Sequence, residues 1–439
     1  MPVIKAFNAV EISALYDIYK QYPSVQTDTR KLKKDDIYFA LKGPNFNGNT
    51  FAQQALDAGA AYAVIDEAAY AVNDKCILVD DVLSTLQHLA TYHRMQFDIP
   101  FIGITGSNGK TTTKELVTAV LSRKYKTYAT EGNLNNHIGV PLTLLKIRAD
   151  AQMAVIEMGA NHQKEIEGYC RIALPTHGLI NNAGKAHIEG FGGIEGVRKG
   201  KGELYDYIRA MGGIIFRNAD LDYLAEMSAG IEKQVTYGSI ADAQYQGTPV
   251  MDSVFLHINL HYEGDNVLIK SLLVGEYNFP NIMAAIAVGL HFGVPLSDIQ
   301  AAIETYNPDN SRSQWLQQGT NKIILDAYNA NPTSMRAAII NFAGAHLPNK
   351  ILWLGGMKEM GADEAAEHAE LVALVQLYEW SDVILVGKEF DGIEHNYKHY
   401  QTSAEAAAAI KANAPQHASI LIKGSRGSKM EVMLQALPA

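Results

Sequence analysis

The sequence predicts an α/β protein with three domains, and three observations lead to this prediction. Short apolar runs alternate with helical stretches along most of the chain, which is typical of mostly parallel sheets. The chain has 439 residues, more than one ordinary hydrophobic core can organise, so two to four domains are expected. One stretch near residue 260 instead has the alternation and the turn of a β-hairpin.

The first domain is expected to cover residues 1–98. Its strand-like apolar runs are Ile37–Leu41, Ala61–Ile65 and Ile77–Val79, and the helical stretch Phe51–Ala58 lies between the first two. The loop Lys42–Asn49 is rich in turn-forming residues. It is either an ordinary surface connection or part of a binding site. The pattern as a whole indicates a small α/β domain.

The second domain is expected at residues 99–310 and the third at residues 311–439. In the second, mostly parallel strands are expected at Phe101–Ile104, Ala154–Ile156 and Gly178–Ile180. A small hairpin is expected to join Ser253–Tyr262 to Asn266–Val274 through the turn Glu263-Gly264-Asp265. The third domain has the pattern of a Rossmann-like fold, and its expected strands are Lys322–Leu325, Ile351–Leu354, Val383–Val386 and Ser419–Ile422.

Composition excludes several classes of protein. The net charge of −10 argues against a broad basic surface for nucleic acid. Two cysteines are too few for a disulfide framework and fit a reducing compartment. No apolar run approaches membrane-spanning length, and the first residues lack the pattern of a secretory signal. We therefore expect a cytoplasmic protein.

The most informative motif is the glycine-rich loop Gly106–Thr113, which follows an apolar run and precedes a helical stretch. In this order the three elements form a phosphate cradle. Glycines let backbone N–H groups turn inward, Lys110 supplies a positive charge, and a threonine hydroxyl can hold Mg²⁺. Ile104 stands where a standard Walker A motif has its first glycine. The alternative is a glycine-rich turn with an exposed lysine.

Polar side chains follow several predicted strands at their carboxyl ends. Glu157 and the loop 181–187 do so in the second domain, and Asp326 and Lys423–Arg426 do so in the third. Because ligands of open α/β sheets bind beyond the carboxyl ends of the strands, we expect the functional site at these two polar edges. Glu157 is expected to bind Mg²⁺ there, since this ion prefers hard oxygen donors, although a solvated glutamate is the alternative.

Other polar positions are ambiguous from the residues alone. A lone histidine such as His187 is more often structural than a metal ligand. Lys199 and Lys201 lie in a basic stretch that either contacts phosphates or is simply solvated. Asn278 and Asn281 precede an alanine-rich helical stretch, where they can cap the helix or read the edge of a base.

Taken together, these motifs resemble those of the Mur ligases, the ATP-dependent amide ligases of cytoplasmic peptidoglycan synthesis. The resemblance covers essentially the whole chain. The matching segments are Thr27–Arg30, Gly106–Thr113, Gly132–Pro141, Glu157, His187, Asn278, Asn281, Arg312, Asp326–Pro332 and Lys423–Arg426. The last two are most similar to the ligases of this family that add D-alanyl-D-alanine to UDP-N-acetylmuramoyl-tripeptide.

The resemblance implies a role for each matching position. Catalytic roles fall to Lys110, His187 and Lys201, and Lys201 matches a lysine that several Mur ligases carbamylate, with Lys199 as its neighbouring alternative. The implied ATP contacts are Gly106, Ser107, Asn108, Gly109, Lys110, Thr111, Thr112, Asn278, Asn281, Arg312 and Asp326. The implied ligands of two Mg²⁺ ions are Thr111, Glu157 and His187. The implied substrate contacts are Thr29, Arg30, Asn135, Asn136, Asn329, Asn331, Lys423, Ser425 and Arg426.

The resemblance also implies a reaction. ATP phosphorylates the carboxylate of UDP-N-acetylmuramoyl-tripeptide, and the amine of D-alanyl-D-alanine attacks the acyl phosphate. The first domain is expected to bind the UDP-sugar, the second ATP, and the third the incoming dipeptide and part of ATP. No nucleic acid and no stable membrane insertion are expected, and a monomer is the expected state.

Three positions depart from the family pattern. Gly356 stands where the sequence Leu-Gly-Asp-Met has an aspartate, Thr29 replaces a serine, and Asn47–Asn49 replaces Asp-Gly-His. The change at Gly356 puts a contact of the third domain in question but leaves the ATP-binding motifs intact.

Three alternative functions remain. A Mur ligase that adds a diamino acid is disfavoured, because the Asp-Asn-Pro-Arg stretch typical of diaminopimelate-specific enzymes is absent from the sequence. An enzyme similar to folylpolyglutamate synthetase would not explain the segment Thr27–Arg30. A non-catalytic nucleotide-binding relative conflicts with the presence of Lys110, Thr111 and Glu157.

Overall fold

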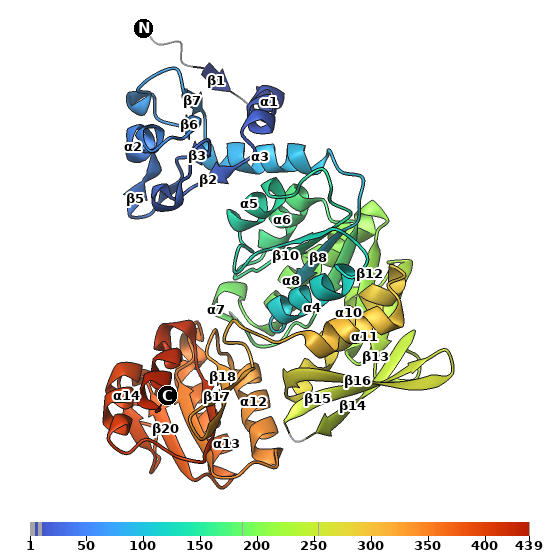
Figure 1. Ribbon diagram of the computed structural model, residues 1–439, viewed down its shortest axis with the longest axis vertical. Coiled ribbons are helices and arrows are strands. Elements are labelled where there is room, and N and C mark those ends of the chain that lie inside the picture. The colour runs from blue at the N-terminus through green and yellow to red at the C-terminus, as the bar shows by residue number, and fades with distance from the viewer. Residues whose placement is uncertain (1–4, 8–10, 187, 253, 439) are drawn as a thin grey trace. The chain divides into compact units, whose positions relative to one another are not determined.

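The computed structural model describes residues 5–7, 11–186, 188–252 and 254–438 (Figure 1). The chain divides into two compact units. The first unit comprises residues 1–103, 125–160 and 164–178, and the second comprises residues 104–124, 161–163 and 179–439. Strands β8 (Phe101–Thr105) and β11 (His177–Ile180) each contain a point at which the chain passes from one unit to the other.

The first unit begins with a five-stranded, fully parallel sheet. Its strands, in spatial order, are β1 (Lys5–Phe7), β7 (Cys76–Val79), β6 (Tyr62–Ile65), β3 (Ile37–Phe39) and β2 (Val25–Gln26). Helices α1 (Ile12–Gln21), α2 (Ala52–Asp57) and α3 (Val82–Arg94) accompany it. A small core of mainly alanine side chains joins α2 to the sheet, so the helix packs close to the strands.

The same unit contains the parallel pair β9 (Thr127–Ala129) and β10 (Met153–Glu157), with helices α5 (Gly139–Leu145) and α6 (Glu165–Ala173). Arg94, at the end of α3, donates hydrogen bonds to the carbonyl oxygens of Ala173 and Leu174, both at 3.0 Å. Its guanidinium also lies 3.6 Å from the ring centroid of Phe101. These contacts fix α3 against the end of α6.

The second unit contains the helix that follows the glycine-rich loop, α4 (Lys110–Leu121), together with α7 (Ile188–Phe191), α8 (Ile194–Met211) and α9 (Asp222–Met227). Helices α10 (Phe279–His291) and α11 (Leu296–Thr305) follow later in the chain. A Cβ atom at Gly289 of α10 would lie 2.5 Å from a methyl carbon of Val120, so a glycine is needed where α10 approaches α4.

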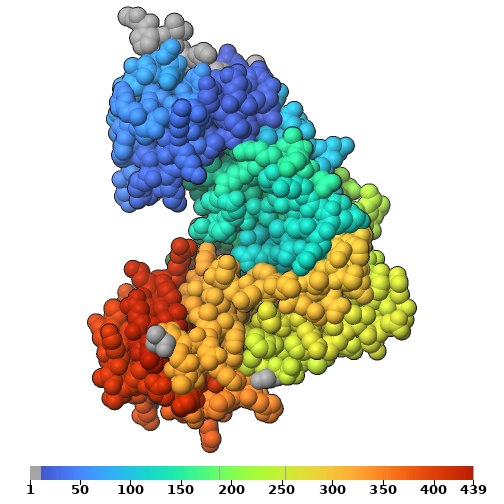
Figure 2. All heavy atoms as spheres, viewed as in Figure 1, coloured from blue at the N-terminus to red at the C-terminus, as the bar shows by residue number. Residues whose placement is uncertain are grey.

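Strands β12 (Ile214–Asn218), β13 (Lys233–Gly238) and β14 (Tyr245–Asp252) of this unit pair in parallel with one another, in that order. Strands β15 (Phe255–Tyr262) and β16 (Asp265–Val274) then add antiparallel pairs to β14. Figure 2 shows the gold atoms of α11 directly against the yellow-green atoms of these strands, and Lys270 N donates to Glu304 Oε1 at that contact, at 3.0 Å. The predicted hairpin is confirmed, and β14 extends it.

A six-stranded sheet closes the second unit. Its strands, in spatial order, are β17 (Gln314–Gln318), β18 (Asn321–Asp326), β22 (Ser419–Lys423), β19 (Lys350–Gly355), β20 (Asp382–Val386) and β21 (Lys398–Tyr400). Only the β17–β18 pair is antiparallel among them. Helices α12 (Pro332–Gly344) and α13 (Glu364–Gln376) cover one face, and α14 (Ser403–Lys411) covers the other (Figure 1).

The strands expected from apolar runs are present in the structure, most of them one residue longer at one or both ends. Strands such as β10, β19 and β22 are buried at nearly every position, which explains why they read as continuous apolar runs. Among the described residues, no helix is both long and apolar enough to cross a membrane.

Candidate functional site

The glycine-rich loop has the backbone of a phosphate cradle. Gly106 and Gly109 have φ values of 150° and 80°, and Gly109 is the N-cap residue of α4. Lys110 Nζ donates to the carbonyl oxygen of Gly106 at 2.7 Å, so the ammonium lies back over its own loop. Thr111 and Thr112, in the first turn of α4, are buried. A helix N-terminus and an ammonium therefore converge on the same loop, which favours an anion there.

The loop after β11 is hydrogen-bonded to the glycine-rich loop. Asn108 N donates to Asn182 Oδ1 at 3.0 Å, and Asn182 Nδ2 donates back to the carbonyl of Asn108 at 3.2 Å. Ser107 N donates to the Asn182 carbonyl at 3.0 Å, and Ser107 Oγ donates to the Gly184 carbonyl at 2.8 Å. These paired bonds fix Ser107 and Asn108, and sequence reasoning missed Asn182 because its partners lie 74 residues away.

A buried network of amides lies beneath Gly109. Asn281 Oδ1 accepts hydrogen bonds from Thr113 Oγ1 and Asn181 Nδ2, both at 3.0 Å, and Asn281 Nδ2 donates to Asn278 Oδ1 at 2.8 Å. A Cβ atom at Gly109 would lie 2.4 Å from Asn281 Oδ1. Asn278 and Asn281 thus support the loop from below, and both are buried.

In the first unit, Glu157 ends strand β10 and is buried. Asn135 Nδ2 donates to Glu157 Oε1 at 2.7 Å, and Thr130 Oγ1 accepts from Glu157 N at 2.9 Å. A Cβ atom at Gly159 would lie 2.9 Å from the amide of Asn135, so this glycine leaves the space that the amide fills. Asn136, next in the chain, is exposed and accepts from the backbone of Gly139 at 2.8 Å. Asn135 therefore orients the carboxylate that sequence reasoning selected.

Lys199 and Lys201, whose roles the sequence could not decide, differ in burial on helix α8. Lys201 is 1% exposed and its ammonium lies 4.9 Å from the ring centroid of Phe191, whereas Lys199 is exposed. A Cβ atom at Gly200 would lie 2.4 Å from that ring, so the aromatic side chain covers this part of the helix. His187 lies outside the described residues.

Polar side chains gather at the carboxyl edge of the six-stranded sheet. Lys423 forms a short ion pair with Asp326, which also accepts from Ser313 N at 3.2 Å. The guanidinium of Arg312 lies 3.7 Å from the ring centroid of Tyr328, and that of Arg426 lies 5.4 Å from it on an exposed side chain. This edge therefore presents cations and an aromatic ring together.

Two asparagines that follow Tyr328 behave differently. Asn329 is exposed and its Oδ1 accepts from the backbone of Ala330 at 2.9 Å. Asn331 is buried and caps α12, because its Oδ1 accepts from Ser334 N at 2.9 Å. Asn331 Nδ2 also donates to Asn108 Oδ1 at 2.7 Å, which joins the C-terminal sheet region to the glycine-rich loop. Ser425, after β22, is buried as well.

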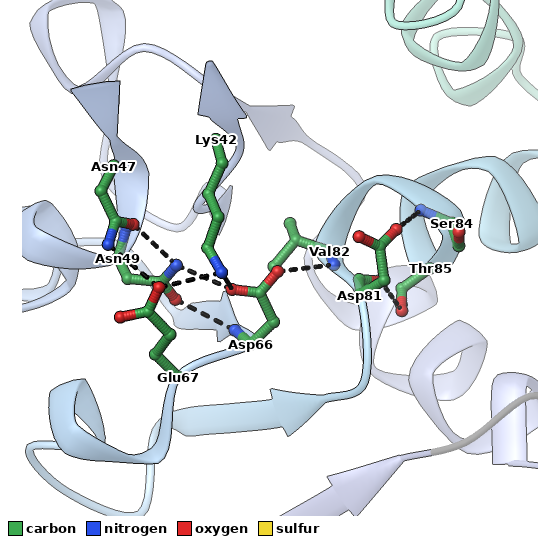
Figure 3. A network of polar contacts seen from close by, with 9 residues as sticks. All are labelled: Lys42, Asn47, Asn49, Asp66, Glu67, Asp81, Val82, Ser84 and Thr85. Atoms are coloured by element: carbon green, nitrogen blue, oxygen red, sulfur yellow. Dashed lines mark hydrogen bonds and ion pairs between the residues drawn. The ribbon is translucent and has the colours of Figure 1, made fainter. Parts of the chain in front are cut away.

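The first unit contains a separate polar network around the loop 42–49 (Figure 3). Asn49 is fully buried, donates to Asp66 Oδ1 at 2.8 Å and accepts from Asp66 N at 3.0 Å. Lys42 Nζ lies 2.9 Å from a carboxylate oxygen of Asp66 and 2.9 Å from one of Glu67. Burial raises the pKa of Asp66, but hydrogen bonds from Lys42 and Asn49 outweigh burial and keep that pKa below its ordinary value. The loop is thus anchored rather than a loose surface connection.

Thr29 and Arg30 begin a short 3₁₀ turn, Thr29–Lys31, that Asp28 caps. Arg30 makes two side-chain hydrogen bonds to Asp28, each at 2.8 Å, and these bonds lower the pKa of Asp28 to about 2. The guanidinium is exposed, so it remains accessible to an anionic ligand.

Three family models match successive segments of the chain. The model described as Mur ligase family, catalytic domain, matches residues 21–94, the Mur ligase middle domain matches residues 104–289, and the Mur ligase, glutamate ligase domain, matches residues 311–426. The chain is also 35% identical to the UDP-N-acetylmuramoyl-tripeptide–D-alanyl-D-alanine ligase of Bacillus subtilis (strain 168), with 94% of this chain and 92% of that protein aligned. The chain belongs to the Mur ligase family.

Other relatives of this Mur ligase have the same description. The chain is 34% identical to the UDP-N-acetylmuramoyl-tripeptide–D-alanyl-D-alanine ligase of Escherichia coli (strain K12), across 94% of this chain and 93% of that protein. The structure of this chain is similar to a crystal structure of MurF from Acinetobacter baumannii, with a TM-score of 0.85 at 32% identity over 94% of this chain and 92% of that one. The expected family, ligase class and mostly parallel α/β fold are therefore confirmed.

Substitution of Gly109 tests the packing under the glycine-rich loop. Gly109→Ala places a Cβ atom against Asn281 Oδ1 and strains a left-handed backbone, so we expect a loss of about 2–4 kcal/mol in unfolding free energy. ATP affinity should fall about tenfold or more, because the N–H groups of the loop are displaced. Thermal unfolding and nucleotide titration measure both effects.

Gly264→Ala is the matched control, since Gly264 also has a positive φ but a Cβ atom there meets nothing within 4 Å. It should cost only about 1 kcal/mol and leave ATP affinity unchanged. Equal effects of the two substitutions would contradict the packing argument.

The network of Figure 3 generates a second prediction. Asn49→Ala leaves the carboxylate and the backbone N–H of Asp66 without their amide partner, and we expect the unfolding free energy to fall by about 2 kcal/mol. Asn45→Ala, at an exposed position of the same loop, should change it by less than about 0.5 kcal/mol. Urea unfolding of the two variants compares these values, and an Asn49→Ala protein as stable as Asn45→Ala would refute the anchoring role.

Proposed function

We propose that this Mur ligase uses ATP to join D-alanyl-D-alanine to UDP-N-acetylmuramoyl-tripeptide through an acyl phosphate. The observation that carries the proposal is the hydrogen-bonded glycine-rich loop, where the Lys110 ammonium and the N-terminus of α4 lie at the same loop. The names of its relatives at 34–35% identity support the choice of substrates. The reaction takes place in the cytoplasm in this proposal, and the protein acts as a monomer.

A carboxylate does not condense with an amine in water unless it is first activated. In the proposed reaction the tripeptide carboxylate takes the γ-phosphoryl group of ATP, and the amine of the dipeptide then attacks the acyl carbon and expels phosphate. Catalysis then consists mainly of positioning and of charge neutralisation. Lys110 supplies the positive charge, and the phosphates meet the N-terminus of α4 at Gly109, since the backbone N–H groups of Ser107 and Asn108 donate to Asn182.

The oxygen-rich donors of the site suit Mg²⁺. Thr111 offers a hydroxyl and Glu157 a buried carboxylate, and hard oxygen ligands of this kind are what Mg²⁺ prefers. We assign these two residues, with His187, to two Mg²⁺ ions, which when bound would neutralise charge on the phosphates. In the described ranges, no group of three or more His, Cys, Asp or Glu side chains that could hold a metal is present. Lys201 is the buried candidate for carbamylation, in preference to the exposed Lys199.

The remaining residues are assigned to the nucleotide and the two other substrates. For ATP the additional proposed contacts are Ser107, Asn108, Thr112, Asn278, Asn281, Arg312 and Asp326. In the structure the two asparagines 278 and 281 also support the loop, so their proposed role includes positioning. For the UDP-sugar the proposed contacts are Thr29, Arg30, Asn135 and Asn136, and for the dipeptide they are Asn329, Asn331, Lys423, Ser425 and Arg426.

The decisive experiment measures phosphate release from ATP with Mg²⁺ and UDP-N-acetylmuramoyl-tripeptide. We expect release with D-alanyl-D-alanine, little with lysine or diaminopimelate, and none without an amine. Lys110→Ala should lower turnover by roughly 10²–10³-fold or more, because a preorganised charge at the phosphates is lost. Lys126→Ala, at an exposed lysine, is the control and should retain full activity. Near-normal turnover of Lys110→Ala would sink the assignment.

Asn135→Ala tests the orientation of Glu157. The substitution removes the amide that donates to Glu157 Oε1, and we expect the Mg²⁺ concentration at half-maximal activity to rise about tenfold or more. Asn133→Ala, at an exposed position of the same loop, should leave it unchanged. Mg²⁺ titration at saturating ATP provides the measurement, and identical curves for the two variants would show that Asn135 does not orient a metal ligand.

A further inference from the structure

A buried carboxylate at the carboxyl edge of the six-stranded sheet has no role in the reaction described above. Glu389 lies in the short 3₁₀ turn Lys388–Phe390 that follows β20, and its side chain is only 3% exposed. Burying an ionised group is costly unless it is paired, so its position requires an explanation. Burial raises its pKa, but the hydrogen bond and charge of Lys358, a backbone hydrogen bond and the charge of His368 together outweigh burial and keep the pKa below its ordinary value.

Two glycines leave the space that this carboxylate fills. A Cβ atom at Gly356 would lie 2.5 Å from Glu389 Oε2, and a Cβ atom at Gly387 would lie 2.3 Å from it. These glycines follow the neighbouring parallel strands β19 and β20, whose last residues pair in register. The room for this carboxylate therefore comes from the ends of two adjacent strands, and Glu389 reaches it from the second.

The partner of Glu389 is Lys358, which forms a short ion pair with it. The Lys358 side chain is 45% exposed, and its Cε lies 3.7 Å from the position of a Cβ atom at Gly427. The loop around Gly427 is bonded back to Gly356, because Ser428 Oγ donates to the Gly356 carbonyl at 3.1 Å. Glu389 thus holds a partly exposed ammonium beside the loop that contains the proposed dipeptide contacts Ser425 and Arg426.

Among the other cations of this edge, Lys423 is fully engaged and Arg426 is exposed. Lys423 has a side chain only 2% exposed and forms a short ion pair with Asp326, and Arg312 and Arg426 lie against the ring of Tyr328. Lys358 has three N–H donors, and its ion pair with Glu389 occupies one of them. A dipeptide whose amine attacks an acyl phosphate must direct its free carboxylate away from the reacting atoms, and a carboxylate in a protein site requires a cation.

We propose that Lys358 binds the terminal carboxylate of the incoming dipeptide and that Glu389 is the positioning residue that holds Lys358 in place. The inference rests on the proposed function, since it names the substrate group that this edge of the sheet recognises. Gly356 is one of the glycines that this placement of Glu389 requires, because a Cβ atom there would lie 2.5 Å from Glu389 Oε2.

The test compares D-alanyl-D-alanine with its C-terminal amide, which lacks the carboxylate, in the phosphate-release assay with the complete enzyme. The wild-type protein should have a lower KM for the free acid than for the amide. Lys358→Met and Glu389→Gln should each raise the KM for the free acid about tenfold to a hundredfold and remove this preference, with the KM for ATP unchanged. Glu394→Gln, at an exposed glutamate, is the charge-matched control and should behave as wild type. A loss of activity that is equal for acid and amide would assign Glu389 a merely structural role and overturn the proposal.

Moving the carboxylate from residue 389 to residue 356 tests whether its place, rather than the residue that carries it, positions Lys358. Gly356→Asp should impair the enzyme, because its side chain meets the carboxylate of Glu389, whereas Gly356→Asp combined with Glu389→Ala should recover most of the preference for the free acid. Thermal unfolding shows whether each variant folds, and Glu389→Gln, which keeps the size of the side chain, decides the matter if the swap variants do not. A double variant that folds but does not recover the preference for the free acid would contradict the role given to this carboxylate.

The two proposals fail differently. If the wild-type protein uses a different amino acid or peptide as its amine, the proposed function fails, and the same comparison of that amine with its carboxamide still decides the role of Lys358 and Glu389. A wild-type protein that uses no amine at all would overturn both proposals.

Discussion

Asn281 Oδ1 accepts hydrogen bonds from Thr113 and Asn181 at a point 2.4 Å from where a Cβ atom of residue 109 would lie. The glycine-rich loop therefore rests on a polar support rather than an apolar one, and a buried amide of this kind is costly unless every group is bonded. The left-handed turn at Gly109 starts α4, so the positions of Lys110 and Thr111 follow from this support. The glycine is required for two reasons at once, its backbone conformation and the space beneath it.

The carboxyl edge of the six-stranded sheet repeats one arrangement twice. Asp326 and Lys423 are partners in register on adjacent strands, so their ion pair follows directly from strand pairing. Glu389 and Lys358 follow strands β20 and β19, and their ion pair depends on the two glycines that leave room for the carboxylate. The first pair is buried and fixed, whereas the second leaves its lysine partly exposed. Only the second is therefore suited to exchange a solvent contact for a contact with a ligand.

The sequence could predict what is local. Strands buried on both faces read as apolar runs. A strand, a glycine-rich loop and a helix in succession are contiguous in the sequence, so the motif can be recognised without the fold. The choice between Lys199 and Lys201 was also available, because Val197, Lys201 and Ile208 are buried residues on one face of α8. The roles of Asn182, Asp66 and Glu389 were not, since each depends on a partner that only the fold brings near. The assignment of His187 to a metal stays a prediction.

The two amide atoms of Asn331 make separate hydrogen bonds. Its Oδ1 caps α12, and that bond depends only on Ser334 in the same turn. Its Nδ2 is a separate group that donates to Asn108 of the glycine-rich loop. A second polar contact, between Lys185 and Glu367, is an ion pair whose lysine is about half exposed. The hydrogen bond to Asn108 and the cap of α12 are therefore made by different atoms of one side chain, so the first can be lost while the helix remains capped.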